Sequence, residues 1–156
     1  ECLVGSEMCI RDSKKINEET LNKIYRNAHI ALQSISNVLE EAEDEKMKAE
    51  LKDQYDGYEK IIGEISSYMA ELKLEPKDIG AMKKGFMWSA VKFKTLTDNS
   101  TTHLADMMLQ GTIMGITELY TTMRSNGESV TEETRALVKK LLDFEEECEK
   151  KLKSLL

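Results

Sequence analysis

Four side chains of metal-binding type are candidates for a site in this sequence. Glu145 and Cys148 are three residues apart, a spacing that places both on one face of a helix. His103 and Glu118 are large polar interruptions of the apolar stretch 102–123. Carboxylate, imidazole and thiolate are the usual protein ligands of transition metals. His103, Glu118, Glu145 and Cys148 are therefore the candidate ligands for iron, manganese or zinc.

A second set of polar residues lacks the charge that a divalent metal needs. It comprises amide and hydroxyl side chains at inward positions of the expected helices: Asn27, Gln54, Tyr58 and Gln110. An amide keeps the shape and hydrogen bonding of a carboxylate but not its charge. Because buried polar groups need partners, we expect these four to form a buried hydrogen-bonded network.

Composition excludes several classes of function. The 156 residues carry 29 acidic and 22 basic side chains, a net charge of −7, which disfavours nucleic acid as a partner. Three sparse cysteines are no disulfide framework, which favours a cytoplasmic setting, and no apolar run is long enough to span a membrane. No nucleophile motif or phosphate loop occurs, and two histidines leave little for acid–base chemistry. An enzyme is unsupported by these features, and no cofactor is expected unless the metal set is real.

Apolar periodicity predicts four long helices that would position these side chains. The first starts at Asn17 as N-cap and the second ends before Pro76. The third lies between a cap at 98–100 and Asn126-Gly127, and the fourth follows a capping box at 129–132.

The third helix is apolar over most of its circumference, so we expect it to be buried. Gly111 and Gly115, four residues apart, predict a close approach of another helix.

Two segments lie outside this pattern. Residues 1–13 have no helical periodicity and are expected to be a non-native or disordered leader, so that 14–156 form the single domain. The long connection between the second and third helices carries a short amphipathic piece around Trp88. Its lysines make 77–94 a possible contact for a protein partner or an anionic membrane. The alternative is a crossover helix that packs Trp88 on the bundle while its lysines extend to solvent.

Two local sequences and the order of elements resemble a family of small bacterial ferritin-like domains of unknown function. The acidic turn 43–51 and the Leu72-Lys-Leu-Glu75-Pro76 element carry the resemblance, which covers about 17–156. It implies an all-α, ferritin-like four-helix bundle with a long crossover between the second and third helices that carries a short helix. Many members of the wider superfamily bind two iron or manganese ions through Glu and Glu-x-x-His ligands. No Glu-x-x-His occurs in this chain.

Two functions remain open on this evidence. The first is a non-enzymatic binding or structural bundle, expected to be a homodimer, whose metal site has become the amide and hydroxyl network. The second is an iron, manganese or zinc protein of metal storage or oxidative-stress protection.

Overall fold

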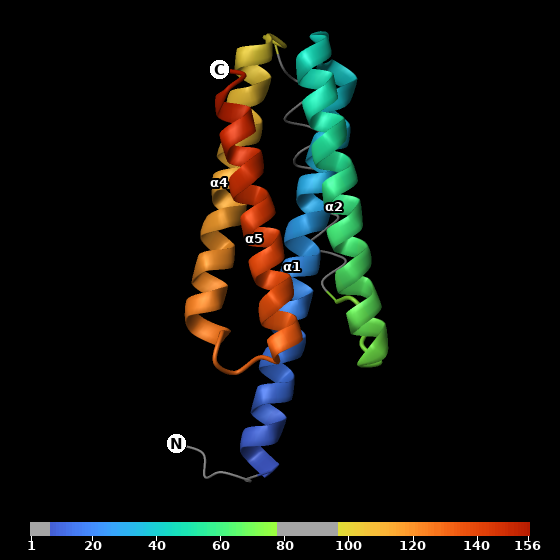
Figure 1. The fold of residues 1–156 in the computed structure, drawn as a ribbon, viewed down its shortest axis with the longest axis vertical. Coiled ribbons are helices and arrows are strands. Elements are labelled where there is room, and N and C mark those ends of the chain that lie inside the picture. The colour runs from blue at the N-terminus through green and yellow to red at the C-terminus, as the bar shows by residue number, and fades with distance from the viewer. Residues whose placement is uncertain (1–6, 78–96) are drawn as a thin grey trace.

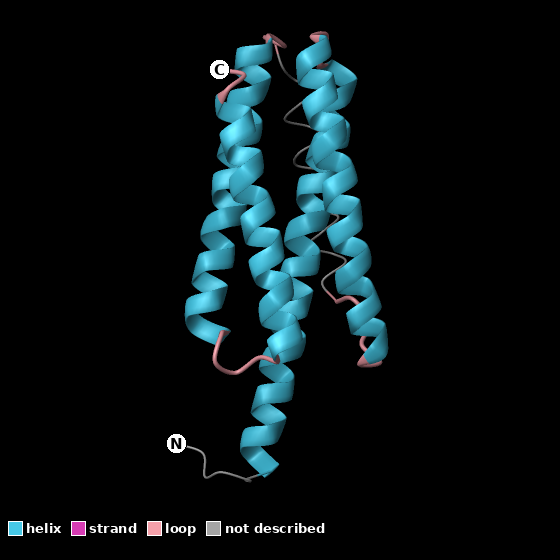
Figure 2. Ribbon diagram, viewed as in Figure 1, coloured by secondary structure: helices cyan, strands magenta, loops and turns pink. Residues whose placement is uncertain are grey.

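The computed structural model describes residues 7–77 and 97–156, which fold into four long helices, with short loops between α1 and α2 and between α4 and α5 (Figures 1 and 2). The helices are α1 (Glu7–Glu41), α2 (Glu45–Glu71), α4 (Thr101–Asn126) and α5 (Glu132–Lys153). Within these described ranges there is no strand. The predicted all-α four-helix bundle is therefore confirmed at this level.

The helices form two antiparallel hairpins that pack side by side (Figure 1). α1 pairs with α2 and α4 pairs with α5, and the hairpins meet where α1 contacts α4 and α5 and where α2 contacts α5. α2 and α4 run in the same direction, so α2 ends and α4 begins at opposite ends of the bundle. The expected short helix of the crossover lies in 78–96, outside the described residues. None of the four described helices is long and apolar enough to cross a membrane.

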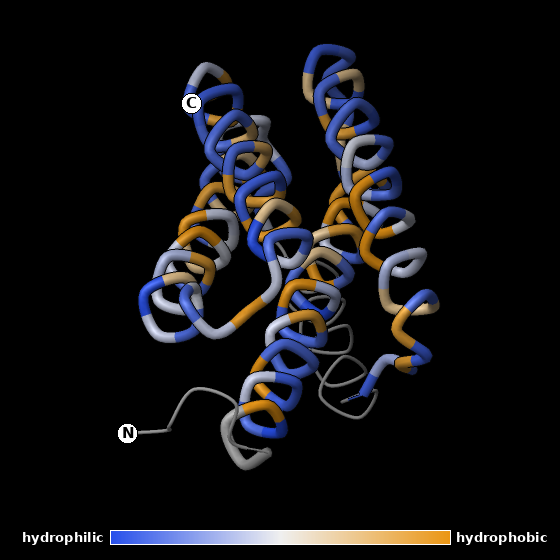
Figure 3. The backbone as a smooth tube through the Cα atoms, turned by 60° about the horizontal axis from the view of Figure 1, so that its bottom comes forward, coloured by the Kyte–Doolittle hydropathy of each residue, from blue (hydrophilic) through white to orange (hydrophobic). Residues whose placement is uncertain are grey.

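One hydrophobic core runs along the bundle axis. Hydrophobic and hydrophilic residues are interspersed along each helix, as the amphipathic periodicity requires (Figure 3). Each helix contributes aliphatic side chains that are at most 1% exposed, among them Leu21, Ile24, Leu51, Ile65, Leu104, Leu119, Leu141 and Leu152. This packing fixes the rotation of each helix about its own axis and so determines which polar side chains point inward.

α1 starts earlier than predicted. It begins at Glu7, and Asn17 is a buried residue inside the helix rather than its N-cap. The amide oxygen of Asn17 instead accepts from the backbone N–H of Thr131 at 3.0 Å, which ties α1 to the start of α5. Residues 10–15 are helical but exposed. The apolar periodicity of the sequence therefore marks where α1 begins to pack against other helices, which is later than the residue at which the helix begins. That 1–13 is a foreign leader stays a prediction.

The other helix ends agree with the sequence or differ by a few residues. Ser100 caps α4 and Gly127 ends it, as expected. Thr131, not Ser129, caps α5 by accepting from the N–H of Thr134. α2 ends at Glu71, and Lys73 follows with a φ of 58°.

α4 is buried on one side only, which corrects the prediction that it is surrounded by protein. Ile113, Met114 and Tyr120 are 43%, 72% and 55% exposed. Gly111 also faces open space, so its predicted close contact is wrong. Gly115 does lie against another helix, because a Cβ there would come within 2.7 Å of the Glu145 carboxylate.

Candidate functional site

Polar side chains from all four helices gather at mid-length of the bundle. We call them the polar cluster, and its members are Arg26, Asn27, Tyr58, Gly115, Glu118, Glu145 and Cys148, with Glu50 and Gln54 at its edge. The cluster unites most of the residues that the sequence assigned to two separate sets.

Helix periodicity brings Tyr58 into this interior. On α2 it continues the buried stripe through Leu51 and Gln54, so its phenol is enclosed and its ring meets Phe144 of α5 edge-on at 4.9 Å. Gly57 makes room for that ring, since a Cβ at Gly57 would lie 2.3 Å from the Phe144 Cζ. α2 and α5 therefore approach closely beside the cluster.

Both carboxylate oxygens of Glu118 are occupied by donors from α1. The Arg26 guanidinium donates to Oε1 at 2.9 Å, and the Asn27 amide donates to Oε2 at 3.1 Å. The same amide reaches the Gly115 carbonyl at 3.3 Å. The negative charge of Glu118 is thus matched by the positive charge of Arg26 within the protein.

Glu145 is the most deeply buried carboxyl of the cluster, at 1% exposure. Burial, and secondarily the charge of Glu118, raise its pKa from 4.5 to about 8, although a hydrogen bond from Tyr58 lowers it. The Tyr58 hydroxyl donates to Oε1 at 3.3 Å. At neutral pH the Glu145 carboxyl is therefore mainly protonated and uncharged.

Two other titratable groups beside Glu145, the Cys148 thiol and the Tyr58 phenol, are also neutral at pH 7. Burial, reinforced by the nearby Glu145, raises the pKa of the Cys148 thiol to about 12. Burial also raises the pKa of Tyr58 well above its ordinary value. The cluster is consequently close to neutral overall, with one ion pair at its α1–α4 edge.

Three buried oxygen atoms around the cluster have no hydrogen-bond partner among the described residues. They are Asn27 Oδ1, Gln54 Oε1 and Glu145 Oε2. All three accept hydrogen bonds, although a protonated Glu145 can also donate. Buried acceptors of this kind usually meet a water, a donor or a cation.

Two predicted site residues lie elsewhere. His103 is in the first turn of α4, where its backbone N–H donates to Ser100 Oγ, and it is about 22 Å along the helix from Glu118 at 1.5 Å per residue. Gln110 is exposed and donates to Asp106 on its own helix at 2.9 Å, so its place in a buried network is a wrong prediction. The error at Gln110 arises because the outer face of α4 also carries apolar residues, whereas His103 is simply too far along the helix axis from the other candidates.

Arg26 is a member of the polar cluster that the sequence did not reveal. Arg26 follows the apolar stripe of α1 without belonging to it, and its role depends on Glu118, 92 positions later. Within 7–77 and 97–156 no group of three or more His, Cys, Asp or Glu side chains is arranged to hold a metal ion. The four predicted ligands do not converge as a set, although Glu118, Glu145 and Cys148 do share one region.

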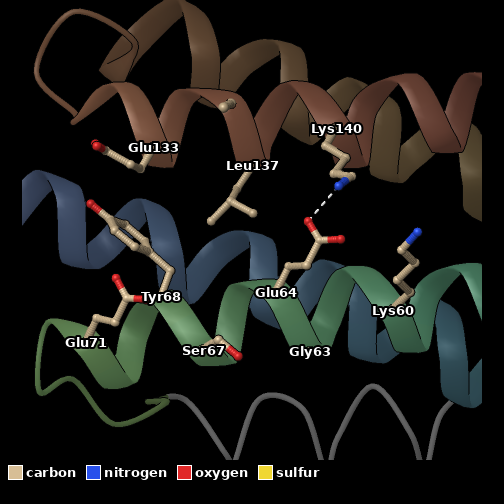
Figure 4. Close-up of a pocket in the computed structure, with 10 residues that line it drawn as sticks. Lys60, Gly63, Glu64, Ser67, Tyr68, Glu71, Glu133, Leu137 and Lys140 are labelled. Carbon is tan, nitrogen blue, oxygen red and sulfur yellow. Dashed lines mark hydrogen bonds and ion pairs between the residues drawn. The ribbon is translucent and has the colours of Figure 1, made fainter.

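A surface groove between α2 and α5 is a separate feature (Figure 4). Gly63 and Ser67 line its α2 side and Leu137 its α5 side, and an ion pair from Lys140 to Glu64 crosses it at 2.6 Å. The cluster residues do not line this groove. We therefore place the candidate site in the bundle interior.

Comparisons with protein-family models, with curated proteins and with solved structures find no match to this chain. The ferritin-like resemblance stays a prediction from the sequence.

Proposed function

We propose that this chain is a ferritin-like helical bundle that acts as a non-enzymatic binding scaffold, in which the polar cluster stands where relatives would hold metal. The observation that carries this proposal is the occupation of Glu118. Both of its oxygens accept from protein donors, and one of those donors is the cation Arg26. The cluster then joins the two hairpins, since Asn27 and Glu118 link α1 to α4 while Tyr58 and Glu145 link α2 to α5.

The residues present do not fit a two-metal centre. Such a centre needs several ionised carboxylates and imidazoles pointing inward. Here one carboxylate is bound by Arg26, the other is protonated at neutral pH, and Cys148 occupies the position where a Glu-x-x-His pair would have its histidine. A thiol with a pKa near 12 is a poor ligand because the thiolate is the binding form.

Metal binding in storage or oxidative-stress protection is the second candidate. The three unpartnered oxygens of Asn27, Gln54 and Glu145 favour it, because hard cations prefer oxygen ligands. A cation there would have to displace the Glu145 proton and would gain at most two carboxylates.

Metal analysis separates the two candidates. The purified protein is measured by mass spectrometry for iron, manganese and zinc, and its thermal unfolding is followed with and without Fe²⁺ or Mn²⁺ under anaerobic conditions. A scaffold retains no stoichiometric metal and its Tm does not move. A metalloprotein retains metal, and its Tm rises with metal concentration because only the folded state binds.

An Asn27→Glu/Cys148→His variant serves as the positive control. It adds a carboxylate from α1 and completes a Glu-x-x-His pair on α5 with Glu145. If the cluster stands at a former metal site, the variant loses stability without metal, because unpaired charge is buried, and recovers it on addition of Mn²⁺. A variant indifferent to metal would contradict the idea that these positions converge as ligands.

The cellular setting and the oligomeric state of the protein are also proposals. We infer a reducing, cytoplasmic setting, supported by the free and buried thiol of Cys148. We also infer self-association, for which the surface of α4 provides support. The suggested partner contact at 77–94 lies almost wholly outside the described residues.

A further inference from the structure

The outer face of α4 exposes apolar side chains in a protein that otherwise has a charged surface. Met114 is the most exposed at 72%, and Ile113 and Tyr120, which are seven residues apart and so lie on one side of the helix, are 43% and 55% exposed. Contiguous exposed apolar groups on one element mark an interaction surface more often than scattered ones do.

α4 itself contributes few charges to this face, although Glu146 of α5 accepts a hydrogen bond from the Tyr120 hydroxyl at 2.6 Å. A third of the whole chain is charged, yet Glu118 is the one Asp, Glu, Lys or Arg between Met107 and Met123. Glu118 is held by Arg26 of α1 and is not available to repel a neighbour. Charges appear only at the two ends of the face, as Asp106 and Arg124.

The residues of this face are ordered as in a helix seam that is symmetric about its centre. Their spacing alternates between four and three, as in a heptad pattern, along Asp106, Gln110, Ile113, Thr117, Tyr120 and Arg124. The spacing is the same from Asp106 to Arg124 as from Arg124 to Asp106. When two such helices pack antiparallel about the midpoint near Gly115, Asp106 of each copy lies opposite Arg124 of the other. Ile113 then lies opposite Thr117.

Asp106 and Arg124 have no ion-pair partner within the described residues. Asp106 accepts only from Gln110 on the same helix, and Arg124 is exposed. In the antiparallel arrangement the pair of Asp106 and Arg124 forms twice, once at either end of the seam. A two-fold interface requires this kind of self-complementarity.

We propose that two copies of this chain form a homodimer by antiparallel packing of α4 against α4, with the two-fold axis between Ile113 and Thr117 and with Asp106 paired to Arg124 across the interface. The proposal deepens the scaffold function and rests on it in naming a second copy as the bound partner. Its test reads the oligomeric state and not the metal content, so it can fail while the metal result stands.

The first test is sedimentation velocity of the full chain over a concentration series. The wild type should show a monomer–dimer equilibrium, and Ile113→Lys should raise the dimer Kd at least about tenfold because it buries a charge beside the axis. Ile10→Lys, an exposed apolar site outside the described bundle packing, is the matched control and should leave the Kd unchanged. A wild type that is monomeric throughout, or a dimer equally sensitive to both variants, overturns the proposal.

The second test is a charge exchange that checks the antiparallel register. Asp106→Arg and Arg124→Asp should each raise the Kd at least about threefold, since each places like charges opposite one another twice. The double variant should return to within about twofold of the wild type. If the double variant is as weak as the singles added together, the helices do not meet in this register. Both residues lie at the surface, so far-ultraviolet circular dichroism should show unchanged helix content.

Discussion

Replacing Glu145 by glutamine should remove the loss of stability that ionisation of this side chain causes in the wild type at alkaline pH. Glu145 has an ordinary pKa of 4.5 and a folded-state pKa of about 8. Between these values the folded state holds a proton that the unfolded state has lost, so stability falls as pH rises through this window. The stabilisation is fully present below pH 4.5 and is lost above pH 8.

The size of the effect follows from the same two values. A tenfold difference in proton affinity corresponds to about 1.4 kcal/mol, so the interval from 4.5 to about 8 sets an upper limit of about 5 kcal/mol. Solvent rearrangement on ionisation makes about 2–4 kcal/mol a realistic range. Glu145→Gln keeps the volume and the acceptor for the Tyr58 hydroxyl, and it cannot ionise.

Urea unfolding followed by circular dichroism from pH 5 to pH 9 measures this difference. Near pH 5 the variant should lie within about 1–2 kcal/mol of the wild type, since both side chains are neutral there. By pH 9 it should be more stable than the wild type by about 2–4 kcal/mol. Glu147→Gln, at an exposed position on the same helix, is the control and should parallel the wild type. Parallel curves for Glu145→Gln would refute the buried, protonated carboxyl.

Three further outcomes follow from local geometry. Lys73→Gly should stabilise the protein by about 0.5–1 kcal/mol in urea unfolding, because Lys73 has a φ of 58° that glycine adopts without a Cβ penalty; a loss would mean that the lysine side chain contributes there. Gly115→Ala should destabilise by about 1–3 kcal/mol, since its Cβ would press on the Glu145 carboxylate, whereas Gly111→Ala on the same helix should stabilise by up to about 1 kcal/mol; equal effects would refute the close approach at Gly115. In a variant without the other two cysteines, Cys148 should react with a thiol reagent at the rate of unfolding, because burial raises its pKa to about 12; fast labelling of the folded protein would show an accessible thiolate.

The helices and part of the site could be predicted because they depend on local periodicity. The stripe through Leu51, Gln54 and Tyr58 identified an inward face of α2 from spacing alone, and Asn27, Gln54, Tyr58 and Glu145 are all buried. Caps at Ser100 and Gly127 were readable because their chemistry acts within one turn.

The pairing of polar groups could not be predicted, because it depends on contacts between distant parts of the chain. Nothing near Glu118 in the sequence indicates that Arg26 and Asn27 would bind it. The burial of residues on α4 was mispredicted for a related reason. Its outer face is as apolar as its inner one, so periodicity could not tell Gln110 and Gly111 from buried residues.

The most direct test of the central proposal is an infrared measurement of the Glu145 carboxyl at pH 7 with and without Zn²⁺ or Mn²⁺. The band of a protonated carboxyl should appear in the difference between the wild type and Glu145→Gln, because this side chain is neutral at that pH. Addition of an equimolar divalent metal should leave the band in place, since Arg26 already balances Glu118 and no ionised pair is available. Loss of the band on metal addition, with release of one proton per chain, would show that the cluster is a metal site and would contradict the scaffold function.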